Sequence, residues 1–260
     1  MSLLYLGMLS LGAEFINATL GMGYGTTLVP ILLLLGYPPD VIVPAILLSG
    51  FITGLMSGGF HHAFGNVSLR KGSRDWGVIL ILSSMGAVGV VSAVFAAVCL
   101  PEIVQRTYIG SMVLVMGILV YVFRNHRLRF SWPRIILVSG IASFNKGISG
   151  GGFGPLVVSG QILSGHGVRN AVGVACLSEG LVCAVGFPLY LLMNGGVGWL
   201  SAHWQFYVPI LAGAAVAAPI ASWTTKVAVQ RFDMRTVIAV VTCALGAWTL
   251  WDTLRPLIFR

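Results

Sequence analysis

Long apolar runs separated by short polar stretches dominate the chain. Ten runs can be delimited, over residues 3–20, 22–35, 41–60, 76–98, 103–123, 133–149, 152–164, 171–192, 204–223 and 236–254. Most are close to the ~20 residues that an α-helix needs to cross a hydrocarbon layer of ~30 Å. The pattern therefore predicts an all-α, polytopic membrane protein with about eight to ten hydrophobic segments.

Two of the runs are short, and each of them starts at a glycine cluster. Residues 22–35 begin within GMGYG (21–25), and residues 152–164 begin within GGGFG (150–154). Apolar segments of this length are typical of re-entrant or broken helices. Backbone can leave the helical form at membrane depth only where protein buries it or where it lines a water-filled cavity. Each cluster therefore predicts a helix break. The sequence leaves open whether residues 3–35 and 133–164 cross the membrane fully or re-enter it from one side.

The two clusters lie 129 residues apart, and the same offset recurs along the chain. Pairs that match at this offset include Ala13/Ala142, Phe15/Phe144, Gly36/Gly165, Ser49/Ser178, Arg106/Arg235, Thr107/Thr236 and Gly117/Gly246. A continuous register of this kind indicates a duplicated half, a hallmark of transporter folds. We therefore expect a single membrane domain over residues 1–260, with one repeat over about 1–128 and the other over about 129–260.

Charged residues indicate how the two halves are oriented. The chain is 57% hydrophobic and only 8% charged, which leaves too little polar surface for a soluble globule. In an inverted arrangement one side of the membrane holds Arg255 and Arg260, and the other holds Arg70, Lys71, Arg74, Arg124, Arg127, Arg129, Arg134, Arg169, Lys226, Arg231 and Arg235. With parallel halves, nine of the same basic residues would lie on one side of the membrane and four on the other. The positive-inside rule favours the inverted repeat, and it explains the net charge of +8 without nucleic acid as a partner.

The glycine clusters also predict a binding site. The segments that follow them would begin with unpaired N–H groups and the positive end of a helix dipole, an arrangement that receives anions. Two such ends, related by pseudo-symmetry, would form one site near the midplane of the bilayer. Close packing of helices is the alternative, because small residues serve it equally well. The residues expected to line the site are Asn17, Thr19, Gly21, Gly23, Tyr24, Gly25, Asn145, Lys146, Ser149, Gly150, Gly151, Gly152, Phe153 and Gly154.

Ionisable residues within the apolar runs are functional candidates by default, because burying them in lipid is costly. Lys146 is expected to contact the anion, with an ion pair to Glu14 as the alternative. Glu179 is a candidate for proton or cation coupling, with a structural ion pair as the alternative. Glu14, Arg169 and Gln161 complete the group of candidates for coupling or gating. No metal or cofactor is expected, since the four cysteines lack metal-ligand spacing.

The duplicated glycine-aromatic-glycine turns resemble a known family. Further features that carry the resemblance are the prolines that follow the turns (Pro30 and Pro155), the stretch Gly36-Tyr-Pro-Pro and the stretch Gly165-His-Gly-Val-Arg-Asn-Ala. The chain resembles, over nearly its whole length, the sulfite exporter TauE/SafE family, which is also called the 4-toluene sulfonate uptake permease family. The resemblance implies a multi-pass carrier in a bacterial-type inner membrane, often with about eight spans. It implies small sulfur-containing anions, such as sulfite or organosulfonates, as substrates. We therefore expect an exporter that works by alternating access, not an enzyme.

Two other functions fit parts of the sequence. Residues Gly147-Ile-Ser-Gly150 spell the GxSG of intramembrane serine proteases, with Ser149 as nucleophile and His166 or His203 as base. The equivalent of Ser149 in the first half is Leu20, which argues against this reading. A channel for small anions shares the glycine breaks and inverted halves. The identity of the anion, the direction of transport, a proton or other coupling ion, and the oligomeric state, for which a homodimer is one option, stay open.

Overall fold

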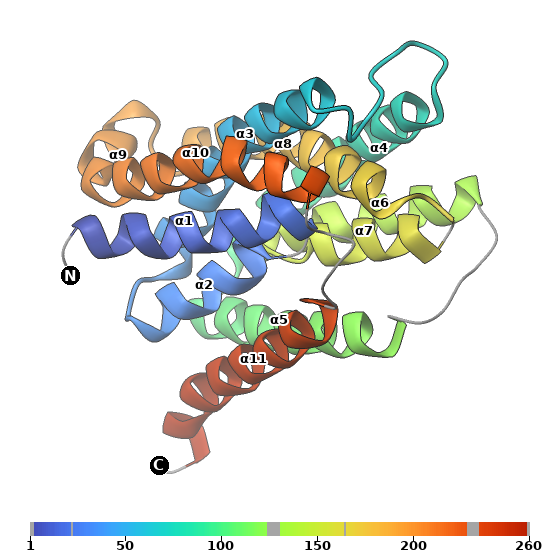
Figure 1. The fold of residues 1–260 in the computed structure, drawn as a ribbon. Coiled ribbons are helices and arrows are strands. Elements are labelled where there is room, and N and C mark those ends of the chain that lie inside the picture. The colour runs from blue at the N-terminus through green and yellow to red at the C-terminus, as the bar shows by residue number, and fades with distance from the viewer. Residues whose placement is uncertain (1–2, 22, 124–130, 164, 228–233, 259–260) are drawn as a thin grey trace.

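The protein is all-helical in a computed structural model that describes residues 3–21, 23–123, 131–163, 165–227 and 234–258 (Figure 1). Within these ranges the chain forms α1 (Leu3–Leu20), α2 (Tyr24–Leu34), α3 (Pro39–Ala63), α4 (Arg74–Cys99), α5 (Glu102–Phe123), α6 (Trp132–Ser149), α7 (Phe153–Leu163), α8 (Val168–Met193), α9 (Val197–Ala202), α10 (Trp204–Val227) and α11 (Met234–Ile258). All ten apolar runs are found as helices. The six-residue helix α9 was not predicted.

Six of the described helices are long and apolar enough to cross a membrane, namely α1, α3, α4, α5, α8 and α10. This confirms an all-α, polytopic membrane protein. The short helices α2 and α7 have 11 residues each. At 1.5 Å per residue such a helix is about 16 Å long, roughly half of the hydrocarbon layer. Neither can cross alone.

Each short helix turns back toward the side on which the helix before it began. Gly7, near the start of α1, packs against Pro209 of α10, and Tyr37, just after α2, contacts Phe206 of α10 in a tilted arrangement with ring centroids 4.7 Å apart. The start of α1 and the end of α2 therefore both lie near the start of α10. In the same way, both ends of the α6–α7 pair lie at the start of α4, where Gly77 contacts Trp132 and Asp75 contacts His166. Helices α1 and α2, and likewise α6 and α7, therefore form two helical hairpins, each with both ends at one end of the bundle.

The helices pack in reciprocal pairs. Helix α1 runs along α10, and α6 runs along α4, so each hairpin packs on a helix of the other half of the chain. The pair α3–α8 is antiparallel, since Gly54 meets Gly180 while Gly58 meets Leu177. The pair α5–α11 is antiparallel too, with Gly110 next to Leu250.

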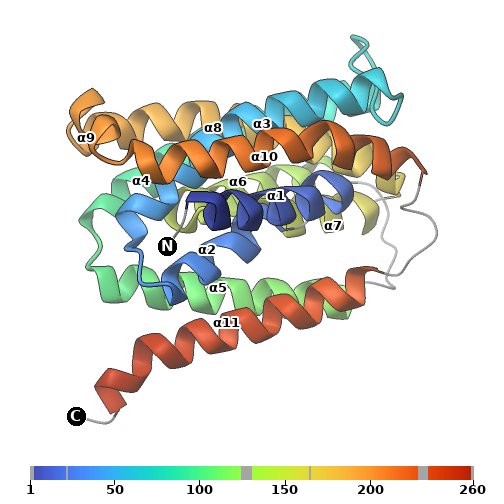
Figure 2. The same ribbon diagram turned by 60° about the vertical axis from the view of Figure 1, so that its left-hand side comes forward.

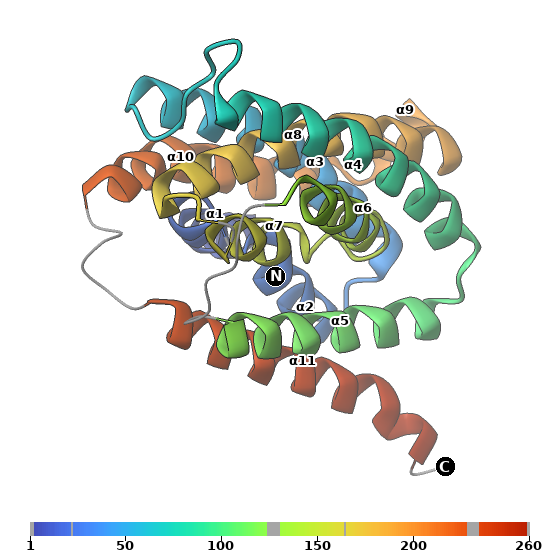
Figure 3. The ribbon, with the colours of Figure 1, turned by 90° about the vertical axis from the view of Figure 1, so that its right-hand side faces the viewer.

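The two hairpins lie in the middle of the bundle. Figures 2 and 3 show α5 and α11 as a layer on one side and α3, α4, α8 and α10 on the other, with α1, α2, α6 and α7 between them. Contacts of α2 with α11, of α7 with α5 and of α1 with α8 hold this arrangement together. The turns that carry the glycine clusters are therefore enclosed by protein, as irregular backbone at membrane depth requires.

Candidate functional site

The two glycine turns pack directly on each other. A Cβ atom on Gly25 would lie 1.8 Å from the Gly150 carbonyl oxygen, and one on Gly154 would lie 2.2 Å from the Gly21 carbonyl oxygen. Gly21 and Gly150 also have left-handed φ values of 70° and 71°, which glycine adopts without a steric penalty. Close approach of two backbones therefore explains four of the predicted site glycines, which is the packing alternative of the sequence analysis.

Polar groups join the turns to each other and to their surroundings. The backbone N–H of Gly152 donates to the Thr26 hydroxyl at 3.2 Å, which links the two halves. Tyr24, fully buried, donates to the Ser49 hydroxyl at 2.6 Å. Its equivalent Phe153 is equally buried. The N-terminal turns of α2 and α7 are thus covered by protein on the side where an anion was expected.

A buried ion pair stands next to these turns. The Lys146 Nζ atom lies 2.5 Å from Oε1 of Glu179, and the Lys146 side chain has no exposed surface. Glu14 is also buried; it accepts from the Asn17 amide at 3.3 Å and from the Ser57 hydroxyl at 3.5 Å. The ion-pair partner of Lys146 is therefore Glu179 of α8, whereas the sequence analysis considered Glu14 for this role.

The remaining predicted residues near the turns are also bound to protein. Asn145 accepts a short hydrogen bond from the Tyr108 hydroxyl through Oδ1. The Thr19 hydroxyl reaches the Ala221 carbonyl oxygen at 3.5 Å. The Ser149 hydroxyl donates to the Asn145 carbonyl oxygen at 2.7 Å and accepts from the Gly151 N–H at 3.1 Å.

The protease interpretation gains no support from this geometry. The hydrogen bonds of the two histidines considered as bases go elsewhere, from His166 to Gln161 and from His203 to the Trp199 carbonyl oxygen. A Ser–His dyad needs the base within hydrogen-bond reach of the nucleophile. In the described part of the chain, Ser149 has backbone partners only.

Gln161 and Arg169, two of the candidates for gating, lie at the end of the bundle where α7 meets α8. Gln161 donates to the Ala171 carbonyl oxygen at 3.3 Å and accepts from His166. Burial lowers the pKa of His166, the Arg74 guanidinium adds to this effect, and the Asp75 carboxylate opposes it. Arg169 lies in the first turn of α8. Neither candidate contacts the Lys146–Glu179 pair.

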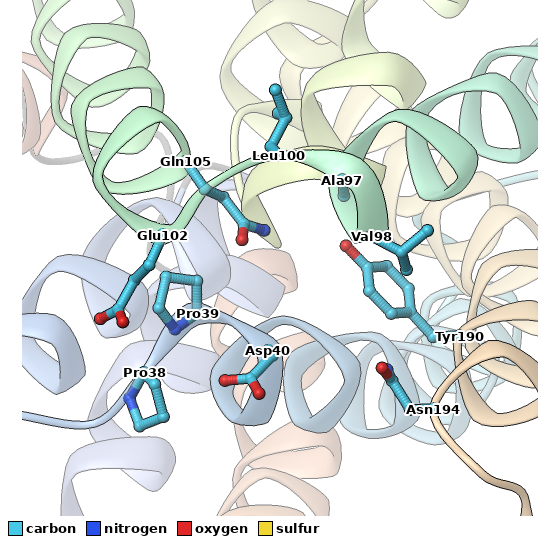
Figure 4. Close-up of a pocket in the computed structure, with 10 residues that line it drawn as sticks. All are labelled: Pro38, Pro39, Asp40, Ala97, Val98, Leu100, Glu102, Gln105, Tyr190 and Asn194. Carbon is cyan, nitrogen blue, oxygen red and sulfur yellow. The ribbon is translucent and has the colours of Figure 1, made fainter.

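A cavity of about 350 Å³ opens at the opposite end of the bundle (Figure 4). It lies between the start of α3, the end of α4, the start of α5 and the end of α8. Its lining residues are Pro38, Pro39, Asp40, Ala97, Val98, Leu100, Glu102, Gln105, Tyr190 and Asn194. The sequence analysis placed none of them in a site, although the Tyr-Pro-Pro-Asp stretch and Gln105 beside Arg106 are polar interruptions that mark this place.

The inner wall of the cavity reaches the end of α6. The Gln105 amide donates to the Ile148 carbonyl oxygen at 2.9 Å, and the Tyr190 hydroxyl donates to the Gly147 carbonyl oxygen at 3.0 Å. Gln105 and Tyr190 project into the cavity from different helices (Figure 4). These carbonyl groups directly follow Lys146 in the chain, so the cavity ends beside the second glycine turn.

The other end of the bundle has an equivalent contact. His61 of α3 bonds to the Ala18 carbonyl oxygen at 3.0 Å, and Asn66 donates both to His61 and to the Ser222 carbonyl oxygen. Residues 61 and 18 lie 129 positions before Tyr190 and Gly147. In each half a side chain thus bonds to a carbonyl group at the equivalent helix end. Tyr190 does so at the inner wall of the cavity, and His61 does so as a buried residue.

Comparisons with known proteins agree on one class. The family model described as "Sulfite exporter TauE/SafE" matches residues 6–249. The chain is also similar to the "Probable membrane transporter protein YtnM" of Bacillus subtilis (strain 168), with 29% identity over 233 residues that cover 85% of this chain and 73% of the relative. No solved structure gives a significant match.

Proposed function

Because the chain belongs to the sulfite exporter TauE/SafE family, whose model spans nearly all of it, we propose that it is a secondary carrier that exports small sulfur-containing anions. The observation that carries this proposal is the pair of central hairpins, with a cavity that ends at one of them. Sulfite is the anion that the family description names, and the expected cation-containing site would also suit organosulfonates. A bacterial inner membrane is the proposed location.

An inverted repeat gives the carrier two equivalent gates. The contact of Gly25 with Gly150 becomes the contact of Gly154 with Gly21 when each residue is moved by 129 positions to its equivalent. Equivalent helices also run antiparallel where they meet, as in the pairs α3–α8 and α5–α11. These features support halves related by a two-fold axis in the membrane plane, the arrangement on which many carriers base alternating access.

Positive charge assigns the two ends of the bundle to the two sides of the membrane. The described residues Arg70, Lys71, Arg74, Arg134, Arg169 and Lys226 lie at or near helix ends on the side of His61. Five further arginines used in the sequence argument, Arg124, Arg127, Arg129, Arg231 and Arg260, lie outside the described residues. By the positive-inside rule the basic end is cytoplasmic. The cavity then opens to the outside, and the structure corresponds to an outward-facing state.

The proposed anion site lies at the inner end of the cavity. An anion there would contact Lys146 and Asn145 once Gln105 and Tyr190 release the Ile148 and Gly147 carbonyl groups. Asp40 places negative charge at the mouth, which favours release of an anion to the outside, while Glu102 forms an ion pair with Arg106 at 2.7 Å. For an anion that leaves without a proton, the membrane potential acts in the same direction, by about 2.3 kcal/mol for each charge per 100 mV.

Flux into liposomes tests the proposal. Purified protein would be reconstituted, and uptake of sulfite, thiosulfate, an organosulfonate, taurine and a carboxylate of similar size would be measured against protein-free liposomes. We expect saturable flux of at least one sulfur anion and none of the carboxylate. Flux that rises linearly with concentration would favour the channel, which shares the same fold features. Absence of flux for every sulfur anion would contradict the proposed substrate class.

A further inference from the structure

Three ionisable side chains from three helices meet beside the glycine turns. Glu14 of α1, Lys146 of α6 and Glu179 of α8, called here the buried triad, have 1%, 0% and 5% of their surface exposed. Lys146 and Glu179 form the ion pair at 2.5 Å, and Glu14 interacts electrostatically with both. The triad therefore contains two acids and one base in a site that protein encloses almost completely.

The other titratable groups around Glu14 add no positive charge. Tyr24 on α2 and Cys176 and Cys183 on α8 are neutral at neutral pH by their ordinary chemistry. His61 on α3 bonds to the Ala18 carbonyl oxygen through Nε2 and accepts from the Asn66 amide through Nδ1, the pattern of a neutral ring. Helix α10 contributes Lys226, which is exposed in its last turn. With both acids ionised, the site would hold an uncompensated negative charge.

An uncompensated charge in a low-dielectric site is neutralised by binding a proton or a counter-ion. A metal cation is disfavoured, because the Lys146 ammonium group occupies the same site. Glu14 has neutral neighbours, the Asn17 amide and the Ser57 hydroxyl, whereas Glu179 has the ammonium group. We propose that the buried triad is a proton-binding site in which Glu14 holds one proton at neutral pH beside the Lys146–Glu179 ion pair.

This inference rests on the proposed function where it concerns transport. A monoanion that takes the place of Glu179 on Lys146 leaves the released carboxylate without its positive partner. A second proton, taken from water through the open cavity and bound by a Glu179 carboxylate oxygen, restores neutrality. The triad thus binds a monoanion and a proton together, and both leave together when the carrier opens to the other side.

Infrared spectroscopy tests the proton on Glu14 without any substrate. The carbonyl stretch of a protonated carboxylic acid would be measured on purified protein at neutral pH. We expect a band from one buried acid in the wild type, none in Glu14→Gln, and about twice the intensity in Lys146→Met, where both acids lack a positive partner. Asp252→Asn, which changes an exposed acid on α11, serves as the matched control and should keep the wild-type band. Glutamine is isosteric with the protonated acid, so Glu14→Gln should fold.

A wild-type spectrum without this band, or a band unchanged by Glu14→Gln, would overturn the proton site. Proton uptake then tests the link to transport. Addition of a singly charged organosulfonate to lightly buffered protein should bind about one proton for each anion, and anion affinity should rise about tenfold for each unit of falling pH. The double variant Glu14→Gln/Glu179→Gln should show neither effect. Binding without proton uptake would overturn the coupling. Failure of every sulfur anion to bind would overturn the proposed substrate class and the coupling with it, while the infrared result stands separately.

Discussion

Single glycines decide how closely the two hairpins approach each other. The Gly25 and Gly150 backbones meet where a methyl group would overlap a carbonyl oxygen. Oxygen of the backbone cannot swing away as a flexible side chain can, so the hairpins would have to separate. The glycines therefore allow the two hairpins to pack closely. This contact also fixes the positions of the polar residues beside it, including Lys146 and Asn145.

Substituting Gly25 by alanine should destabilise the protein. Overpacking of a well-filled core typically costs about 1–3 kcal/mol, and the Cβ atom here would lie 1.8 Å from the Gly150 oxygen. The matched control is Gly59→Ala on α3, where no atom lies within 4 Å and alanine is the better helix former. We expect a lower melting temperature and reduced flux for Gly25→Ala and wild-type or higher stability for Gly59→Ala, measured on protein in detergent. Equal stability of the two variants would contradict the close packing.

At the scale of elements, the cavity depends on where four helix ends leave space. Helix α4 has one face toward the cavity, through Ala97 and Val98, and another face toward lipid, which includes Val88 with 64% of its surface exposed. The same helix therefore offers two positions at which an equal increase in side-chain volume should have different effects on transport.

Filling the cavity should block transport and leave the fold intact. Val98→Trp would place an indole in a space of about 350 Å³, between the mouth and the Gln105–Tyr190 wall. We expect flux in liposomes to fall at least tenfold with little change in melting temperature, because the new side chain enters an existing space. Val88→Trp, which points away from the bundle, should transport as the wild type does. If Val98→Trp keeps full flux, the cavity is not on the transport route.

The elements were easier to predict than the contacts between them. Apolar runs of helical length locate the helices, because lipid allows few alternatives for the backbone. The cavity could not be predicted, since it depends on four helix ends that are distant in the chain, such as Asp40 and Asn194. The partner of Lys146 depends on the rotation of α8, which places Glu179 within 2.5 Å, and nothing in the sequence fixes that rotation.

In the described residues the two ends of the molecule differ, although its helices pack reciprocally. At one end Tyr190 bonds to the Gly147 carbonyl oxygen under the cavity, and at the other His61 bonds to the equivalent Ala18 carbonyl oxygen and is fully buried. Two halves with the same packing and different openings suit a carrier, because exchange of the two arrangements would open the other end. In such an exchange the hairpins would shift relative to one of the two layers beside them, either the α5–α11 layer or the layer that contains α3 and α8.

The orientation of this asymmetric molecule in the membrane gives the last prediction. Ser68 follows α3 at the basic end, and Ser201 lies in α9 at the end with the cavity; both are exposed. In a variant without Cys99, Cys176, Cys183 and Cys243, a single cysteine would be placed at one position or the other and treated with a charged thiol reagent that does not cross lipid. Right-side-out vesicles should label Ser201→Cys only, and inside-out vesicles should label Ser68→Cys only, because the six described basic residues near Ser68 favour a cytoplasmic location for that end. Labelling of both cysteines from the same side would contradict the assignment of the two ends to opposite sides of the membrane. The reverse pattern, with Ser68→Cys labelled from outside and Ser201→Cys from inside, would mean that the cavity opens to the cytoplasm and would contradict the proposed outward-facing state.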